Sequence, residues 1–390
     1  MTETPREFDI VVFGATGFTG AKTAEYLARH APETLKWAIA GRNREKLDVA
    51  AQKLLSLGGP CRHVGIVEAS VEDDESLARM ARRTRVLVTT VGPFVDYGEP
   101  VVRACVEQRT DYVDSTGEPY FARLLVARYA EEAARRGVRL IPSCGFDSIP
   151  TDLGVLFTVN QLPRNEAMRI SGYVRLEGRF SGGTERSAIK ALGPPRELIA
   201  EVEPVATSGR RVRLGAAKVE RRPELGGWTA PLPTIDGSVV LRSAARIERY
   251  GPDFSYEHNV VHASFLHLFA AFCVFGSVAF LARFRTFRDL LLKLVKKSGE
   301  GPTDEQMSRS WFTVRFSAEC AGKTLQTEVS GGDPAYGETS KMLAESALCL
   351  AFDGDSLPAL SGVLTPAEAM GDVLLERLKR AGLRFRVLAN

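Results

Sequence analysis

Short apolar runs alternate with amphipathic stretches over the first 155 residues of the chain. Runs typical of buried strands lie at residues 8–13, 36–40, 63–68, 86–91, 112–113 and 138–141. Between them, apolar positions recur every three or four residues, as at 74–83, 99–108 and 120–136, which predicts helices. Because strands alternate with helices, we expect residues 1–155 to form a Rossmann-type, doubly wound parallel sheet of the α/β class.

A glycine-rich turn follows the first predicted strand and precedes a helical pattern. Its sequence is Gly14-Ala15-Thr16-Gly17-Phe18-Thr19-Gly20. Glycines at such positions permit a tight turn, close approach of the backbone to phosphate, and close packing of helix on strand. The spacing Gly-x-x-Gly-x-x-Gly differs from the commoner Gly-x-Gly-x-x-Gly, and a purely structural turn is the alternative. We expect all seven residues to bind the pyrophosphate of a dinucleotide at the start of the helix.

The second predicted strand ends in Gly41-Arg42 rather than in an acidic residue. A carboxylate here would bind the ribose hydroxyls of NAD, whereas the guanidinium of Arg42 would pair with a 2′-phosphate. The sequence therefore predicts NADP as the cofactor and Arg42 as its phosphate ligand, with Arg44 or Lys46 as further candidates. The alternative is a set of solvated charges at the start of a helix.

Three loops follow the fourth, fifth and sixth predicted strands. Ligands of doubly wound sheets bind beyond the carboxyl ends of the strands, so we expect these loops to converge on one site. Val91-Gly92-Pro93 would let a nicotinamide ribose approach the backbone. Tyr97, Glu118 and Asp147 are the candidates for orienting a substrate or supplying a proton. For polar residues in such loops, helix capping or loop closure is the alternative.

The pattern of residues 156–390 predicts a second domain, of the α+β class. We expect that its C-terminal helices can pack back on the first domain. The predicted elements are a strand at 167–176, a hairpin at 312–319 and 324–330, a helix at 338–350, and a last helix capped by Thr365. Residues 181–184 are a candidate lining of the active-site mouth, although a glycine-rich turn explains them as well. Residues 196–237 are rich in Pro, Gly and charge and predict irregular connections.

One segment differs in composition from the rest of the chain. Residues 258–282 contain no Asp, Glu, Lys or Arg, and phenylalanines recur at 265, 269, 272, 275 and 280. Basic and apolar residues then alternate in a helical pattern up to Lys297. An apolar helix followed by a basic amphipathic one is typical of anionic membrane surfaces. We expect residues 258–297 to be helical and to make the protein peripheral on a membrane; a buried helix pair or a homodimer interface is the alternative.

Composition narrows the function classes further. The chain has 390 residues, enough for two domains, and its apolar share of 44% is ordinary for a globular protein. A net charge of +3, without a basic run interleaved with aromatic residues in the first domain, gives no reason to expect a nucleic-acid partner. The six cysteines contain no Cys-x-x-Cys pair, so neither a metal centre nor a disulfide framework is expected. The polar N-terminus is unlike a signal peptide, and we expect a cytoplasmic protein, held on the inner face of the plasma membrane where it contacts lipid.

Several segments resemble those of the saccharopine dehydrogenase-like oxidoreductases. In the first domain these are the glycine-rich turn, Ala40-Gly41-Arg42, Val91-Gly92-Pro93-Phe94, and Cys144-Gly145-Phe146-Asp147-Ser148-Ile149-Pro150. Residues 362–370 are similar to the same family, especially to its bacterial branch of trans-acting enoyl reductases. The resemblance covers nearly the whole chain, and it implies a two-domain NADP-type fold and an association with polyketide-derived glycolipids.

Together, the residues and the resemblance predict an NADP-dependent oxidoreductase. The preferred reaction is reduction of an activated C=C bond in a hydrophobic, lipid-linked or polyketide-type substrate of glycolipid biosynthesis. Two alternatives stay open at this point. One is a saccharopine-type dehydrogenase acting on a C–N bond, and the other is a catalytically silent, NADP-binding module associated with membranes.

Overall fold

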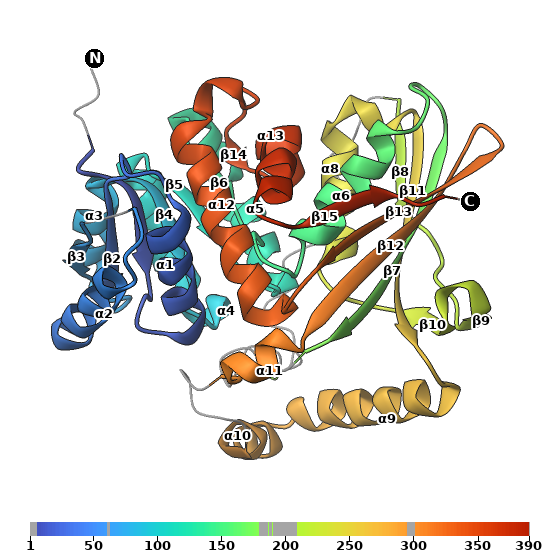
Figure 1. Ribbon diagram of the computed structural model, residues 1–390, viewed down its shortest axis with the longest axis horizontal. Helices are drawn as coiled ribbons and strands as arrows, with labels where there is room; N and C mark the ends of the chain where they lie inside the picture. Colours follow the sequence, from blue (N-terminus) through green and yellow to red (C-terminus); the bar gives the residue numbers. More distant parts are fainter. Residues whose placement is uncertain are drawn as a thin grey trace.

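Two β-sheets form the centre of the protein, with helices packed between them and over the outer face of the first (Figure 1). The structure is a computed structural model that describes residues 6–60, 63–178, 186, 189, 209–294 and 301–389. The candidate loop 181–184 lies outside the described residues. Residues 8–141, blue to blue-green in Figure 1, supply all of the first sheet except one short strand at residues 362–363.

The first sheet is parallel throughout, with the strand order β14-β6-β5-β4-β1-β2-β3. Its strands are β1 (Phe8–Phe13), β2 (Trp37–Gly41), β3 (Gly65–Glu68), β4 (Thr84–Thr89), β5 (Asp111–Asp114), β6 (Arg139–Ile141) and β14 (Gly362–Val363). The order 3-2-1-4-5-6 is that of a doubly wound sheet, which confirms the Rossmann-type prediction. The sequence pattern missed β14, a short strand that extends the sheet beside β6.

Helices cover both faces of this sheet. α1 (Phe18–His30) and α2 (Arg44–Ser56) lie on one face, and α3 (Asp74–Arg82), α4 (Phe94–Gln108) and α5 (Pro119–Arg136) lie on the other. Successive strand side chains point to opposite faces, so Val12 joins the core under α1, whereas Val11 and Phe13 join the core under α4. Burial on both faces explains why these strands are almost wholly apolar.

A helix from the C-terminal part of the chain completes the α1 side of the sheet. α12 (Thr339–Phe352) packs against α1 and across β1, β4 and β5, and most of its side chains are buried. It lies between the two sheets in Figure 1. As a result, one continuous hydrophobic core runs from α1 through α12 to the second sheet.

The second sheet is mixed and has the order β15-β13-β12-β7-β11-β10-β9, with β8 also paired to β11. Its strands are β7 (Met168–Glu177), β8 (Arg211–Leu214), β9 (Glu220–Arg222), β10 (Gly227–Pro231), β11 (Asp253–His262), β12 (Trp311–Cys320), β13 (Lys323–Gly331) and β15 (Arg384–Val387). α6 (Ile149–Asn160) and α8 (Asp236–Arg246) pack on it, and α13 (Pro366–Arg380) packs on α6 and α12. The predicted α+β character of this half is therefore confirmed.

The smaller elements are η1 (Pro223–Leu225), η2 (Glu248–Tyr250), η4 (Gly354–Ser356), the π-helical turn η3 (Pro334–Glu338) and α11 (Asp304–Ser308). The predicted hairpin is β12–β13, and Thr365 caps α13 in a capping box with Glu368, as expected. The prediction of irregular structure was wrong for residues 209–237, which contain β8, β9, β10 and the start of α8. All three strands are short, and β8 and β9 are rich in charge; they form because their backbones pair with β11 or with each other.

The apolar segment forms two helices, α9 (Phe265–Ala282) and α10 (Arg285–Leu294), which lie apart from both sheets (Figure 1). The predicted helical segment 258–297 was wrong at its start, because residues 258–262 are the end of β11 and 259–262 pair with β10. Residues 295–297 lie outside the described part of the chain. By length and composition, α9 is apolar enough to cross a membrane, with a mean hydropathy of 2.2 and only 6% of it buried.

A buried carboxylate joins three of the helices between the sheets. Asp152 of α6 accepts a hydrogen bond from Ser243 Oγ of α8 at 2.6 Å and one from the amide of Ala367 in α13 at 2.8 Å. Burial outweighs these two hydrogen bonds and raises the pKa of Asp152 from its ordinary 3.8 to about 7. The folded protein therefore holds a proton at this site that the unfolded chain releases.

This pKa shift makes the stability of the protein depend on pH. Because the native state binds the proton more tightly, the contribution of Asp152 to the free energy of unfolding falls as the pH rises from about 4 to about 7. Asp152→Asn cannot ionise at this position. We expect urea unfolding to show the stability advantage of the wild type over Asp152→Asn shrinking by at least about 1 kcal/mol between about pH 4 and about pH 8. A constant difference over this range would contradict the assignment.

Candidate cofactor site and active site

The glycine-rich turn joins β1 to α1, and two of its glycines have no room for a side chain. Gly14 has a φ of +89°, in the left-handed region, and a Cβ atom there would lie 2.8 Å from Thr90 Oγ1. A Cβ atom on Gly20 would lie 2.3 Å from the carbonyl oxygen of Gly14. The helix therefore starts directly against the ends of β1 and β4, which is the close packing that a dinucleotide-binding turn requires.

The start of α1 offers backbone amides to an anion. Gly17 is the N-cap residue of the helix, and no side chain caps it. Around it, Ala15 is buried, Thr16 is exposed, and Phe18 and Thr19 are half-buried in the first turn. The phosphates of a dinucleotide would accept hydrogen bonds from these amides and would be favoured by the positive end of the helix dipole. The residues present thus fit the predicted pyrophosphate.

Arg42 follows β2 at the same edge of the sheet. Its side chain is exposed, and it forms no ion pair with any residue in the described part of the chain. Its neighbour Arg44 is engaged with Asp48 at 3.0 Å and with Glu68 at 3.6 Å. Asn43 caps α2 by accepting a hydrogen bond from the Lys46 amide. Of the two arginines after β2, Arg42 is therefore the one available to a 2′-phosphate.

Two carboxylates hold together the loops that follow β4, β5 and β6. Asp114, at the end of β5, accepts a hydrogen bond from the amide of Ser143 at 2.9 Å, which joins the loops after β5 and β6. Glu118 accepts hydrogen bonds from the amides of Phe94 at 3.0 Å and Val95 at 2.8 Å, which joins the loops after β5 and β4. The three loops therefore meet, as the strand-end argument predicted.

Because of these contacts, Glu118 has a structural role. Both of its carboxylate oxygens accept amides at the start of α4, directly after Val91-Gly92-Pro93, the segment expected beside the nicotinamide ribose. Tyr97 lies on the first turn of α4, is 39% exposed, and makes no side-chain hydrogen bond to another described residue. The catalytic roles of Glu118 and Tyr97 stay predictions.

Asp147 differs from the other carboxylates of these loops, Asp114 and Glu118, because the residue is exposed. Its carboxyl lies against the loop after β5, since a Cβ atom on Gly117 would lie 2.9 Å from Asp147 Cγ. Burial of the carboxyl, followed by the charges of Asp236, Glu118 and Asp114, raises the pKa of Asp147 to about 7. A carboxyl that keeps a proton near neutral pH is suited to general acid catalysis.

A buried chain of polar side chains from β11 and α8 includes Asp236, whose charge acts on Asp147, and the sequence reasoning missed this chain. The Tyr256 hydroxyl and His258 Nδ1 are 2.8 Å apart, and His258 Nε2 lies 3.5 Å from a carboxylate oxygen of Asp236. Burial lowers the pKa of His258, against the opposing effect of Asp236. The available signal was the alternation of polar residues along β11, which puts Tyr256 and His258 on one face. Among the described residues, no group of His, Cys, Asp or Glu is arranged to hold a metal ion, and the prediction of no metal stays untested.

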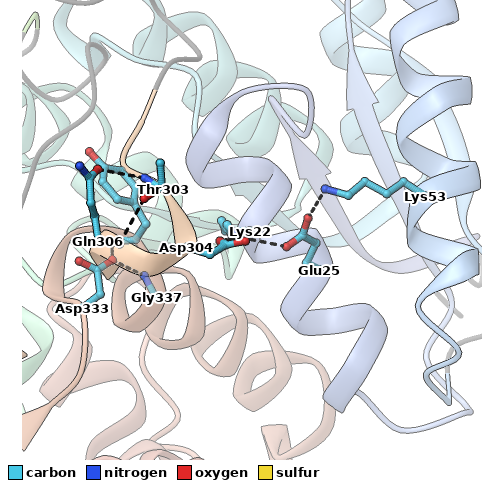
Figure 2. Close-up of polar contacts among 9 residues, drawn as sticks. Lys22, Glu25, Lys53, Thr303, Asp304, Gln306, Asp333 and Gly337 are labelled. Carbon is cyan, nitrogen blue, oxygen red and sulfur yellow. Dashed lines mark hydrogen bonds and ion pairs between the residues drawn. The ribbon is translucent and has the colours of Figure 1, made fainter. Parts of the chain in front are cut away.

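The C-terminal half of the chain closes over the glycine-rich turn. Tyr336 of η3 packs edge-on against Phe18, with ring centroids 4.7 Å apart, and the Ser340 hydroxyl donates to the Thr19 carbonyl at 3.3 Å. Figure 2 shows a second connection, in which Asp304 of α11 pairs with Lys22 of α1 at 3.1 Å. The loop before α12 therefore forms one wall of the cofactor site.

The position of Arg42 gives a test of cofactor choice. We expect Arg42→Ala to weaken NADPH binding by about 10- to 100-fold, because a charge-assisted contact to the 2′-phosphate is lost, and to change NADH binding little. The measurement is calorimetric titration with both cofactors. Arg44→Ala is the matched control: its guanidinium is already paired within the protein, so we expect a much smaller change. Equal losses for NADPH and NADH in Arg42→Ala would refute the phosphate assignment.

Comparison with known proteins agrees with this geometry. Residues 10–141 match the family model of the saccharopine dehydrogenase NADP-binding domain. A trans-acting enoyl reductase of Mycobacterium bovis is 34% identical over 98% of both chains. The human saccharopine dehydrogenase-like oxidoreductase is 33% identical over 100% of this chain and 99% of its own. The apo saccharopine dehydrogenase (L-Glu forming) of Saccharomyces cerevisiae is similar over 98% of this chain and 100% of its own, with a TM-score of 0.57 at 13% sequence identity, which shows a common fold.

These matches extend along the whole chain and confirm the predicted resemblance. They also confirm NADP as the cofactor and the general class of the enzyme, because the matched domain is described by its NADP binding and the relatives are oxidoreductases. The chain belongs to the saccharopine dehydrogenase-like oxidoreductases, and its first sheet is the NADP-binding domain of an enzyme of that family.

Proposed function

We propose that this oxidoreductase uses NADPH to reduce a C=C bond conjugated to a carbonyl group in a lipid or polyketide-type acyl substrate, with Asp147 as the proton donor. The observation that carries the proposal is the position of the Asp147 carboxyl where three loops meet beyond the carboxyl edge of the sheet, together with its pKa of about 7, which burial and the neighbouring carboxylates raise. The mycobacterial relative named as a trans-acting enoyl reductase supports the same reaction class.

In the proposed reaction the cofactor would supply the hydride, and the protein would bind the cofactor and supply the proton. When bound, NADPH supplies the hydride that adds to the carbon β to the carbonyl, and it is oxidised to NADP⁺ as the double bond is reduced. The amides at the start of α1 and the guanidinium of Arg42 hold its phosphates. Asp147 donates its proton to the neighbouring α-carbon, and the resulting carboxylate takes a new proton from solvent, which its exposure permits.

The charge around Asp147 favours this reaction over a saccharopine-type one. An amino-acid substrate brings carboxylates that need cationic partners. The groups that act on Asp147 most strongly are instead the carboxylates of Asp236, Glu118 and Asp114. An acidic surrounding repels a carboxylate-bearing substrate but accepts an uncharged acyl chain. The exposed apolar helix α9 is a second feature that suits a hydrophobic substrate.

A comparison of substrates tests the reaction. The purified protein is mixed with NADPH and either α,β-unsaturated acyl thioesters or pairs of a 2-oxo acid and an amino acid, and the loss of NADPH absorbance is followed. We expect turnover with the unsaturated thioesters and formation of the saturated product, identified by mass spectrometry. Turnover only with the imine-forming pairs would contradict the proposal in favour of C–N chemistry. Tight NADPH binding without turnover on either set would favour a catalytically silent module.

The proton donor has its own test. We expect Asp147→Asn to lower kcat with an unsaturated thioester by about 10²- to 10⁴-fold while NADPH affinity stays the same, because only the proton is lost. Since Asp147 must be protonated, wild-type kcat should fall as the pH rises through about 7. The matched control is Asp355→Asn, which changes an exposed carboxylate in η4, away from the site. If Asp147→Asn keeps both the rate and the high-pH decline, another group donates the proton.

A further inference from the structure

The helices α9 and α10 expose an apolar surface that no other part of the described chain covers. The described large apolar side chains with the highest exposure in α9 are Phe265, Leu266, Phe269, Phe272, Val274, Phe275 and Phe280, each at least 50% exposed. α9 makes a ring contact with the sheet only at its start, where Phe265 packs on Trp228 with centroids 5.0 Å apart. These side chains are not part of the hydrophobic core of the protein.

The exposed side chains point in every direction around α9. Successive residues of an α-helix are rotated by about 100°, so the exposed Leu266, Phe272 and Val274 lie on three different sides. A second copy of the chain would cover one side of such a helix and leave the others in water. Acyl chains of lipids surround an inserted helix completely. The distribution of exposure therefore favours lipid as the occupant.

Both ends of α9 are attached to the same body of the protein. One end continues from β11, and the other leads through α10 to Gly301, where a Cβ atom would lie 2.5 Å from the Phe18 ring, and to Asp304, which pairs with Lys22 of α1 (Figure 2). A helix that crosses a bilayer has its ends on opposite sides. With both ends held on one side, α9 is suited to lie in the plane of the membrane.

α10 has the composition of a helix at the headgroup level. Phe287, Leu290 and Leu294 form an exposed apolar stripe, because they are spaced by three and four residues. Arg288 and Lys293 fall outside this stripe, and Asp289 is the only acidic residue of the helix. Cations beside an apolar stripe bind anionic lipid headgroups, such as those of a cytoplasmic leaflet.

We propose that α9 and α10 dock the protein on an anionic phospholipid membrane, with α9 lying in the plane among the acyl chains and α10 at the headgroups. The docked helices are connected to the wall of the cofactor site through Gly301 and Asp304. A lipid-borne acyl substrate would then reach the site from the membrane side, a point that rests on the proposed function. The docking itself does not depend on catalysis.

Vesicle flotation of the full chain tests the docking. We expect the wild type to float with phosphatidylcholine vesicles that contain phosphatidylglycerol, and Phe269→Ser/Phe272→Ser/Phe275→Ser to bind at least about tenfold more weakly, because apolar area no longer enters the membrane. The matched control is Val49→Ser/Leu55→Ser, which changes exposed apolar side chains of α2 and should bind as the wild type does. Arg288→Glu/Lys293→Glu should lose about tenfold or more of the preference for anionic over neutral vesicles.

Two readouts separate docking from catalysis. NADPH affinity and turnover of a short, water-soluble unsaturated thioester should be the same in the triple serine variant and the wild type, because none of the three residues lies in the site. Vesicle binding that survives the triple substitution would overturn the proposal. So would a wild type that ignores vesicles but forms a dimer that the triple variant lacks, since the apolar surface would then be an interface between copies.

Discussion

The packing of the first turn of α12 fixes the geometry on which every role assigned to the site depends. Thr339 Oγ1 accepts a hydrogen bond from the amide of Phe146 at 3.1 Å, in the loop that carries Asp147, and donates to the Pro334 carbonyl at 2.8 Å. In the next position, Ser340 contacts the glycine-rich turn. One buried helix thus connects the glycine-rich turn to the loop that carries Asp147, although the helix lies far from both in the sequence.

The carboxylates of the site have different roles because their surroundings differ. Asp114 accepts hydrogen bonds from Tyr112 and from backbone amides, and Glu118 accepts two amides of α4, so both hold loops in place. Asp147 sits beside them with solvent access, and their negative charges help to keep it protonated. The structural carboxylates therefore do more than position the loops, because their charges help to raise the pKa of Asp147, the residue proposed as the proton donor.

The sequence allowed the first sheet and the cofactor turn to be predicted because their signals are local. A strand, a glycine turn and a helix lie within residues 8–30, and Arg42 ends the next strand. The strand β14 and the pairing of Asp236 with His258 could not be predicted, since each depends on contacts between distant parts of the chain. Strands β8 to β10 were missed for a related reason: backbone pairing, of β8 and β10 with β11 and of β9 with β10, forms them rather than an apolar pattern.

The exposed apolar side chains of α9 and α10 are unfavourable in water, and the hydrophobic core does not cover them. A soluble protein buries its large apolar side chains because exposing them to water is unfavourable. α9 exposes most of its own, yet the hydrophobic core from α1 to the second sheet is continuous without it. Its composition therefore reflects an interaction outside the fold. Because Gly301 and Asp304, which follow α10 in the sequence, lie against Phe18 and Lys22 of α1, we infer that this interaction takes place near the cofactor site, where a lipid-borne substrate of the proposed function would enter.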